Sequence, residues 1–382
     1  MTSLSPTART APDAGARTGA PQVAIAHDWL VRYAGSERCV EQMLLAFPGS
    51  PVRTSLIRPD ALPEALRDGR PSLLQRIPGA TDHHEWLLPL MPAAWRAMPP
   101  VEDVDAVVSS SHACAKAVRI APGIPHLSYC HTPMRYAWDF EAEQERFPRP
   151  ARPAARAMMA AFRRWDRGSA RNVTRFLANS RAVAGRIERF YGRRAEVVHP
   201  PVETDFYTPG GEREDGFLYV GRLVGYKRPD LVVEAFRELP HRLTIVGQGS
   251  MAEALRARAT PNIEFREGLD DEALRDLYRR SRAMVYPVDE DFGIVMAEAQ
   301  ACGTPVIGID AGGALDIVED GVTGWLMRGR GAEDLRAAVR RAATETLDCA
   351  YIRDRAERFS SAAYRDTLRT AVQEMIADPR PL

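Results

Sequence analysis

Two glutamates, Glu290 and Glu298, enclose seven residues in a segment suited to bind both a sugar and a phosphate. The apolar run before it, residues 283–287, is typical of a buried parallel strand, and the residues after it are typical of a helix. We therefore expect Glu290 in the loop that ends the strand and Glu298 inside the helix. Gly293 should open this helix and leave its first N–H groups free. Carboxylates accept hydrogen bonds from sugar hydroxyls and such amides bind phosphate, so the segment offers partners for both halves of a nucleotide sugar.

A second segment, residues 219–229, carries two basic side chains just after another expected strand. Gly221 fits a tight turn from strand to loop, and Arg222 and Lys227 follow it. A diphosphate leaving group gains negative charge as a glycosidic bond breaks. A planar guanidinium and a compact ammonium are suited to bind that charge. The alternative interpretation is that both are surface charges near the start of a helix.

Two further polar clusters follow expected strands in the first half of the chain. His131 comes just after the strand expected at 125–130, and Pro133 excludes helix there and predicts an exposed turn. A histidine in this place faces the expected ligand site and can hydrogen-bond a sugar; the alternative is a structural histidine. The cluster 109–112 is either a loop on the substrate side or the N-cap region of a helix.

Together these segments resemble the retaining glycosyltransferases of the GT-B type known as group 1 or family 4. The resemblance rests on the E-x7-E spacing with Phe292-Gly293, on the Gly-Arg-Leu-x-x-x-Lys run at 221–227, and on Gly-Thr-Pro-Val-Ile at 303–307. It implies catalytic roles for His131, Arg222, Lys227 and Glu290. It implies donor-binding roles for a longer set: Gly35, Gly221, Arg222, Lys227, Gly268, Leu269, Glu290, Phe292, Gly293, Ile294 and Glu298.

The resemblance is weaker at two of these places. Gly35 stands in a loop that resembles the family's glycine-rich loop near the donor phosphates, but Ala34 replaces the first glycine of the usual pair. Gly268 and Leu269 occupy the place where family members hold the nucleotide base, largely through main-chain groups.

The resemblance also implies the reaction and its partners. It implies a retaining, metal-independent hexosyltransferase in which the acceptor attacks from the same face as the leaving phosphate. The segment 129–138 most resembles bacterial mannosyltransferases of surface-polysaccharide synthesis, so the expected donor is GDP-mannose and the expected acceptor is a glycan or a lipid-linked sugar. No separate cofactor is expected. Three alternatives stay open: a UDP-sugar-dependent glycosyltransferase, a UDP-sugar 2-epimerase of the same architecture, and an inactive nucleotide-sugar-binding protein.

Strand and helix patterns alternate through both halves of the chain and predict an α/β fold with two Rossmann-like domains facing across a cleft. Residues 1–21 are predicted to be a disordered leader, 22–205 the acceptor-side domain and 206–355 the nucleotide-sugar-binding domain. The resemblance implies that residues 356–382 form a helix that crosses back to the first domain. Residues 58–100, which are rich in proline, are expected to be an insertion that lines the cleft.

Composition limits the classes of partner and the location. The 382 residues carry 51 basic and 51 acidic side chains, so no basic field for nucleic acid is expected. Residues 1–200 carry 27 basic and 19 acidic side chains. This basic surplus either arises by chance or indicates an acidic acceptor or an anionic membrane surface. An arginine-rich helix expected at 152–171 either contacts anionic lipid or presents a solvated face. No signal peptide or membrane span is apparent, and the five cysteines are scattered. We expect a cytoplasmic protein, either free or peripheral at the inner membrane face.

Overall fold

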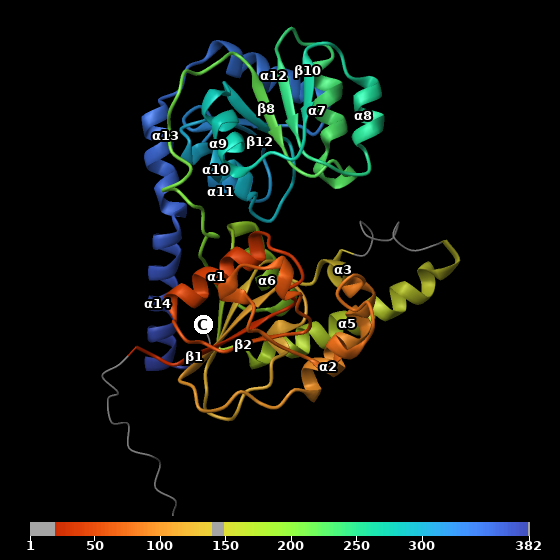
Figure 1. Ribbon diagram of the computed structural model, residues 1–382, viewed down its shortest axis with the longest axis vertical. Coiled ribbons are helices and arrows are strands. Elements are labelled where there is room, and N and C mark those ends of the chain that lie inside the picture. Colours follow the sequence, from red (N-terminus) through yellow and green to blue (C-terminus); the bar gives the residue numbers. More distant parts are fainter. Residues whose placement is uncertain (1–19, 140–148, 381–382) are drawn as a thin grey trace, which may run out of the picture.

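A computed structural model describes residues 20–139 and 149–380 and contains two parallel sheets (Figure 1). Residues 1–19 of the predicted leader lie outside this description. The first sheet has the strand order β3-β2-β1-β4-β5-β6-β7. Its strands are β1 (Val23–His27), β2 (Val52–Thr54), β3 (Arg70–Pro71), β4 (Ala106–Ser111), β5 (His126–Cys130), β6 (Arg175–Ala178) and β7 (Ala195–Val197).

The first sheet is buried on both faces, so that even the three serines at the end of β4 are inaccessible to solvent. In β1 and β4 every residue is buried, and Ile25 lies opposite Val108 in the parallel ladder. Separate apolar clusters cover the two faces, one around Val40 of α1 and one around Trp95 of α2. The α-helices described in this domain are α1 (Gly35–Ala46), α2 (Met91–Ala97), α3 (Arg135–Trp138), α5 (Arg152–Ser169) and α6 (Arg181–Tyr191).

The second sheet has the strand order β10-β9-β8-β11-β12-β13. Its strands are β8 (Phe217–Val220), β9 (Leu243–Val246), β10 (Ile263–Arg266), β11 (Ala283–Tyr286), β12 (Val306–Ile309) and β13 (Gly324–Met327). Its helices are α7 (Pro229–Phe236), α8 (Ala252–Arg258), α9 (Asp271–Arg280), α10 (Ile294–Ala301), α11 (Ala314–Ile317), α12 (Ala332–Thr344) and α13 (Cys349–Ala356). In each sheet the strand order reverses once, at β1/β4 and at β8/β11. Ligands of such folds bind outside the carboxyl ends of the strands at this point.

The last helix, α14 (Ser361–Ala377), returns to the first domain and lies beside α1 (Figure 1). Leu368 and Val372 of α14 are fully buried in the same cluster as Val40 of α1. The predicted fold class, including this crossing helix, is confirmed. The last strand of the first sheet ends at Val197 and the first strand of the second begins at Phe217, on either side of the predicted boundary near residue 205, which stays a prediction.

The arginine-rich segment and the proline-rich residues 58–100 both pack against the first domain. The arginine-rich segment is the helix α5, which buries Met159 and Phe162 against the first domain. Residues 58–100 form short helical pieces, as expected, but Met91 and Trp95 anchor them in the core of the first domain. None of the helices in the described part of the chain combines the length and the apolar content that a membrane span requires.

Candidate functional site

A cavity of about 390 Å³ lies between the carboxyl ends of the two sheets. The first domain contributes residues that follow β1, β4, β5 and β6, and the second domain contributes the loop between β11 and α10. Predicted site residues from both domains therefore meet here. Those that line the cavity are Gly35, His131, Glu290, Phe292, Gly293 and Ile294.

On the wall formed by the second domain, three polar side chains form a closed cluster. The ammonium of Lys227 contacts the Oε1 atom of Glu290 and donates to the hydroxyl of Tyr286 at 2.8 Å. This hydroxyl donates in turn to the Oε2 atom of Glu290 at 2.8 Å. Both oxygens of the carboxylate thus have a partner. An incoming diphosphate would compete with Glu290 for the Lys227 ammonium, because both are anions.

Arg222 reaches the cavity through its neighbour Tyr226. The guanidinium contacts the hydroxyl of Tyr226 and lies 5.5 Å from the centre of its ring. Tyr226 lines the cavity and is half exposed. Gly221 does not line it, but Gly221 and Gly247 pack backbone to backbone, and a Cβ atom at Gly247 would collide with the carbonyl oxygen of Gly221. This close approach brings the loops after β8 and β9 together beside the site.

The start of α10 is shaped by a glycine that no other residue could replace without strain. Gly293 has φ of +89°, and a Cβ atom there would collide with the methyl group of Met296. The preceding Phe292 is buried, and its ring lies 5.5 Å from those of His199 and Phe359. Gly293 and Ile294 consequently present the first turn of α10 to the cavity, as predicted for phosphate binding.

An adjoining cavity of about 230 Å³ surrounds Glu298, and Gly35 and Ile294 line both cavities. Glu298 is almost fully buried, and this burial raises the pKa of its carboxyl group. Tyr278 donates to its Oε2 atom at 3.1 Å, and Arg38 of α1 donates to its Oε1 atom at 3.4 Å. The contact joins the two domains, and sequence reasoning missed Arg38.

Gly268 and Leu269, the predicted base-binding pair, line neither of these two cavities. Gly268 has φ of +68°, and Leu269 packs against the core of the second domain. The adjoining cavity is lined instead by Asp271 and Leu274 of the following helix α9. A role of Gly268 and Leu269 in binding the base stays a prediction.

On the wall formed by the first domain, His131 is half-buried and held at two points. Its Nε2 atom lies 2.8 Å from the hydroxyl of Ser110, and its carbonyl oxygen accepts from the amide of Asn179 at 2.9 Å. Burial, together with the smaller effects of the neighbouring His112 and His27, lowers the pKa of His131 to about 3. The ring is therefore neutral at neutral pH and offers one donor and one acceptor.

Asp28 shapes the loop behind this wall. Its fully buried carboxylate accepts four backbone N–H groups, from His112, Ala113, Cys114 and Ala115, at 2.5 to 2.8 Å. Burial alone would raise the pKa of Asp28, but the charges of His112 and His27 and these N–H groups together lower it. Of the two interpretations of the cluster 109–112, the N-cap is wrong, because residues 109–111 belong to β4 and the next helical turn, Ala115–Ala117, has Cys114 at its N-cap; His112 lines the cavity.

Asp291, the residue after Glu290, joins the two walls. It contacts Arg186 of α6 and accepts from Arg135 of α3 at 3.3 Å, and both arginines belong to the first domain. Sequence reasoning assigned no role to Arg186. Its spacing of 105 residues from Asp291 gives no local signal, because the pair exists only once the domains pack together.

Two expectations about the site are corrected or limited. Residues 58–100 do not line either cavity, because they are anchored in the first domain away from the cleft. Within residues 20–139 and 149–380, no group of three or more His, Cys, Asp or Glu side chains is arranged to hold a metal ion. The sequence has an Asp-x-Asp pair at Asp289 and Asp291, but both carboxylates are held by arginines, Asp289 by Arg330 at 3.1 Å.

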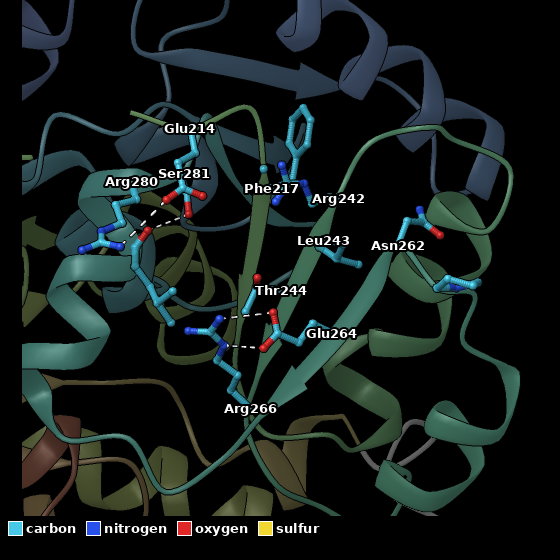
Figure 2. A pocket seen from close by; sticks show the side chains of 13 residues that line it. Glu214, Phe217, Arg242, Leu243, Thr244, Asn262, Glu264, Arg266, Arg280 and Ser281 are labelled. Carbon is cyan, nitrogen blue, oxygen red and sulfur yellow. Dashed lines mark hydrogen bonds and ion pairs between the residues drawn. The ribbon is translucent and has the colours of Figure 1, made fainter. Parts of the chain in front are cut away.

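A separate polar groove of about 230 Å³ lies over β8, β9 and β10 (Figure 2). It includes Phe217 and Leu243, the first residues of their strands, and so lies toward the amino ends of the sheet. Its charges pair with each other, since Arg266 donates to Glu264 at 2.8 Å, as Figure 2 shows. This location is opposite to the ligand-binding edge of such sheets.

Two family models match adjoining parts of the chain. The model described as "Glycosyltransferase Family 4" matches residues 33–206, and the one described as "Glycosyl transferases group 1" matches residues 207–366. The chain belongs to the group 1 and family 4 glycosyltransferases. The residues of the first-domain wall lie within the first match, and those of the second-domain wall lie within the second.

Relatives of this glycosyltransferase share half its length. It is 33% identical over 205 residues to D-inositol 3-phosphate glycosyltransferase of Kribbella flavida, which covers 45% of this chain and 48% of that protein. It is 36% identical over 200 residues to the enzyme of the same name from Geodermatophilus obscurus, with 44% of each chain covered. The chain thus spans about half the length of the curated relatives it matches. Their names do not support mannosyl transfer, so GDP-mannose stays a prediction.

Solved structures of similar fold cover nearly the whole chain. HepE of Anabaena, in complex with UDP and glucose, has a TM-score of 0.67 and 17% identity over 92% of this chain and 99% of its own. Sucrose-phosphate synthase from Thermosynechococcus elongatus has a TM-score of 0.68 and 18% identity over 93% of this chain and 99% of its own. At these identities the likeness establishes the GT-B fold alone.

Proposed function

We propose that this chain transfers a hexose from a nucleoside diphosphate sugar to an acceptor hydroxyl, with retention of configuration and without a metal ion. The observation that carries the proposal is the cluster of Lys227, Tyr286 and Glu290 at the cavity, opposite His131. Glu290 and the first turn of α10 line the same cavity as His131, and Lys227 is paired with Glu290 beside it. This combination suits a diphosphate joined to a sugar.

The proposed reaction needs positioning and charge stabilisation more than a nucleophile. The bond between the anomeric carbon and the diphosphate oxygen breaks, and its electron pair stays on the diphosphate, which Lys227 and Arg222 stabilise. The acceptor oxygen bonds to the anomeric carbon from the same face and passes its proton to the departing phosphate oxygen. Glu290 is already bound by Lys227 and Tyr286, which makes it a better partner for sugar hydroxyls than a nucleophile.

For the donor we propose GDP-mannose, on the resemblance of residues 129–138, and for the acceptor a glycan or lipid-linked sugar. The relatives named D-inositol 3-phosphate glycosyltransferase favour a second class of acceptor, a phosphorylated polyol. A nucleotide-sugar donor is a cytoplasmic metabolite, so we place the protein in the cytoplasm. We also propose that the arginines of α5, which lie outside the cavity, contact anionic lipid.

Thermal unfolding with GDP, UDP or ADP tests the proposal, because a ligand that binds only the folded chain raises the melting temperature. We expect stabilisation by GDP and GDP-mannose, and its loss in Arg222→Ala. Stabilisation by UDP alone would show that the donor is a UDP-sugar instead of GDP-mannose, and the proposed hexosyl transfer would stand. With the donor fixed, release of nucleoside diphosphate is measured with a mannoside, with inositol 3-phosphate and without acceptor. Equal release in all three, or no response to any nucleotide, would overturn transfer.

Full activity in the presence of excess EDTA is expected for a metal-independent reaction. The same release assay is run with EDTA and then with added Mg²⁺ or Mn²⁺. Loss of release with EDTA and recovery with one of the ions would contradict the metal-independent part of the proposal. The leaving diphosphate would then need a metal ion for charge stabilisation, in addition to Lys227 and Arg222.

A further inference from the structure

Three residues on neighbouring strands connect the interior of the first domain to the cavity. His27 at the end of β1 lies opposite Ser110 of β4, and His131 follows β5, the next strand in the sheet. The Nδ1 atom of His27 lies 3.1 Å from the carbonyl oxygen of Ser110 and 3.0 Å from its hydroxyl. The hydroxyl lies 2.8 Å from the Nε2 atom of His131. His27 and Ser110 are fully buried, whereas His131 lines the cavity.

The carbonyl oxygen of Ser110 determines the direction of these hydrogen bonds. A carbonyl oxygen only accepts, so the Nδ1 atom of His27 must carry a proton to be a favourable neighbour at 3.1 Å. The same N–H points at the Ser110 hydroxyl, which therefore accepts from His27. The hydroxyl's own proton is left for the other ring within reach, that of His131.

The direction of the second bond then selects the tautomer of His131. A neutral imidazole has one N–H and one bare nitrogen, and the partner of one nitrogen decides where the proton resides. Because Ser110 donates to Nε2, the proton of His131 is on Nδ1. Among the residues that the structure describes, none is hydrogen-bonded to this Nδ1 atom, and the ring borders the cavity.

We propose that His27 and Ser110 are positioning residues that hold neutral His131 in its Nδ1–H tautomer, so that it donates a hydrogen bond to a hydroxyl of the transferred sugar. The tautomer follows from the geometry of the free protein; its use on a sugar rests on the proposed function. The burial that lowers the pKa of His131 keeps the ring neutral and so keeps the choice between tautomers meaningful.

The chain offers a matched control on the same strand. Ser109, the residue before Ser110, points to the other face of the sheet and makes the same kind of contact, its hydroxyl 2.8 Å from the Nε2 atom of His126. His126 is buried and does not line the cavity. Ser109→Ala therefore removes a buried serine–histidine contact of equal length from β4 without touching the contact to His131.

The direct test is nitrogen NMR of the full chain labelled with ¹⁵N-histidine, without any ligand. Two-bond N–H correlations distinguish the two neutral tautomers, and the signals of His131 are assigned from their absence in His131→Gln. We expect the Nδ1–H pattern in the unaltered chain, a shift toward the Nε2–H pattern in Ser110→Ala, and no change at His131 in Ser109→Ala. An Nε2–H pattern in the unaltered chain would overturn the proposal, and this measurement needs no variant of Ser110 to fold.

The second test asks whether the tautomer matters to the reaction. Loss of one well-oriented neutral hydrogen bond predicts a decrease of about tenfold in kcat/KM for the donor sugar in Ser110→Ala. Ser110→Thr keeps the hydroxyl and should restore most of the rate, and Ser109→Ala should leave it unchanged. If the NMR pattern changes in Ser110→Ala but the rate does not, the use of His131 on the sugar is wrong. If no nucleotide sugar reacts at all, the proposed function fails while the tautomer result stands.

Discussion

On the first-domain wall of the cavity, Asp28 and Glu37 are satisfied by groups of their own domain, whereas the acidic residues of the second-domain wall depend on cations. Asp28 is held by four backbone N–H groups, and Glu37 accepts from the backbone N–H of Ala34 and from the hydroxyl of Ser36. Glu290 is paired with Lys227, and Asp291 and Glu298 are paired with arginines of the other domain.

These different partners indicate that the first wall is fixed when the chain folds, whereas the second wall changes its ion pairs when a ligand binds. Backbone N–H groups cannot leave Asp28 without unfolding the loop, so the first wall is set before any substrate arrives. Lysine and arginine side chains can exchange one anion for another, so the second wall can pass its cations to a diphosphate. Substitutions of the acidic residues should accordingly cost stability on the first wall and activity on the second.

Asp28→Ala should give the largest effect on stability. The substitution leaves four buried N–H groups without an acceptor and two nearby histidines without their carboxylate. We expect a decrease of roughly 3–5 kcal/mol in the free energy of unfolding. Urea unfolding measures it, with Asp28→Asn as the control that keeps the shape and one acceptor oxygen. A decrease below about 1 kcal/mol would show that the first wall is not the rigid one.

Lys227→Ala should lower kcat by roughly 10²–10³, because it removes a charge that stabilises the leaving diphosphate. The melting temperature of the free protein should fall less than in Asp28→Ala, because Glu290 keeps the hydroxyl of Tyr286 as a donor. Asp289→Asn serves as the control: Asp289 is one residue from Glu290, but its partner is the exposed Arg330 at 3.1 Å. An equal decrease of kcat in Lys227→Ala and Asp289→Asn would show that Lys227 has no special role in stabilising the diphosphate.

Acid should destabilise the first domain before it protonates the carboxylates. Burial lowers the pKa of His126 to about 4 from its ordinary 6.5, so between these values the unfolded chain binds a proton that the folded chain excludes. Stability is therefore complete above about pH 6.5 and falls as the pH decreases toward 4, by roughly 3 kcal/mol from this residue. Urea unfolding at several pH values measures the slope.

The control for this pH dependence is His126→Asn, which should reduce the slope between pH 6.5 and 4 and leave the part due to His131, whose pKa is lowered to about 3. Glu37 acts in a lower window: burial alone would raise its pKa, but the hydrogen bond and charge of His27 lower it to about 2, so its contribution is lost only as the pH falls from 4.5 toward 2. An unchanged slope in His126→Asn would assign the acid sensitivity to other groups, such as His131.

Asp291→Asn should give the smallest effect. Its contacts to Arg135 and Arg186 are partly exposed, so the change costs at most about 1 kcal/mol and weakens nucleotide binding by about two- to fivefold. Because exposed charges are screened by salt, the difference from the unaltered chain should narrow at high ionic strength. Calorimetric titration with nucleotide at low and high salt measures this difference in affinity. The control is Asp276→Asn, which removes an ion pair within α9. Equal weakening at both salt concentrations would place Asp291 in direct contact with the ligand.

Local patterns predicted the elements that position the site. The helix expected to open at Gly293 is α10 at Ile294–Ala301, and the strand expected at 283–287 is β11 at Ala283–Tyr286. Both are long enough, and apolar enough, for periodicity to show. The strands β2, β3, β7 and β13 were missed. The first three are two or three residues long, and β3 contains Pro71, so they carry almost no periodic signal.

The same reasoning explains which contacts of the site could be predicted. Glu290, Phe292, Gly293 and Ile294 lie within one segment, and their spacing alone brings them to the cavity. The pair of Arg38 and Glu298 is separated by 260 residues and depends on how two separately folded domains meet. No periodicity or motif within one segment contains that information, because it belongs to the interface.

The two chain segments that cross between the domains are bonded to each other. The backbone N–H of Val202 donates to the carbonyl oxygen of Phe359 at 2.8 Å, and the N–H of Ser361 donates to the carbonyl oxygen of Val202 at 3.1 Å. Two crossings joined in this way act as one pivot, because neither can lengthen alone without breaking these bonds. We therefore expect any relative motion of the domains to be a swing about this line and not a slide. Such a swing would keep the groups that face each other across the cleft in register.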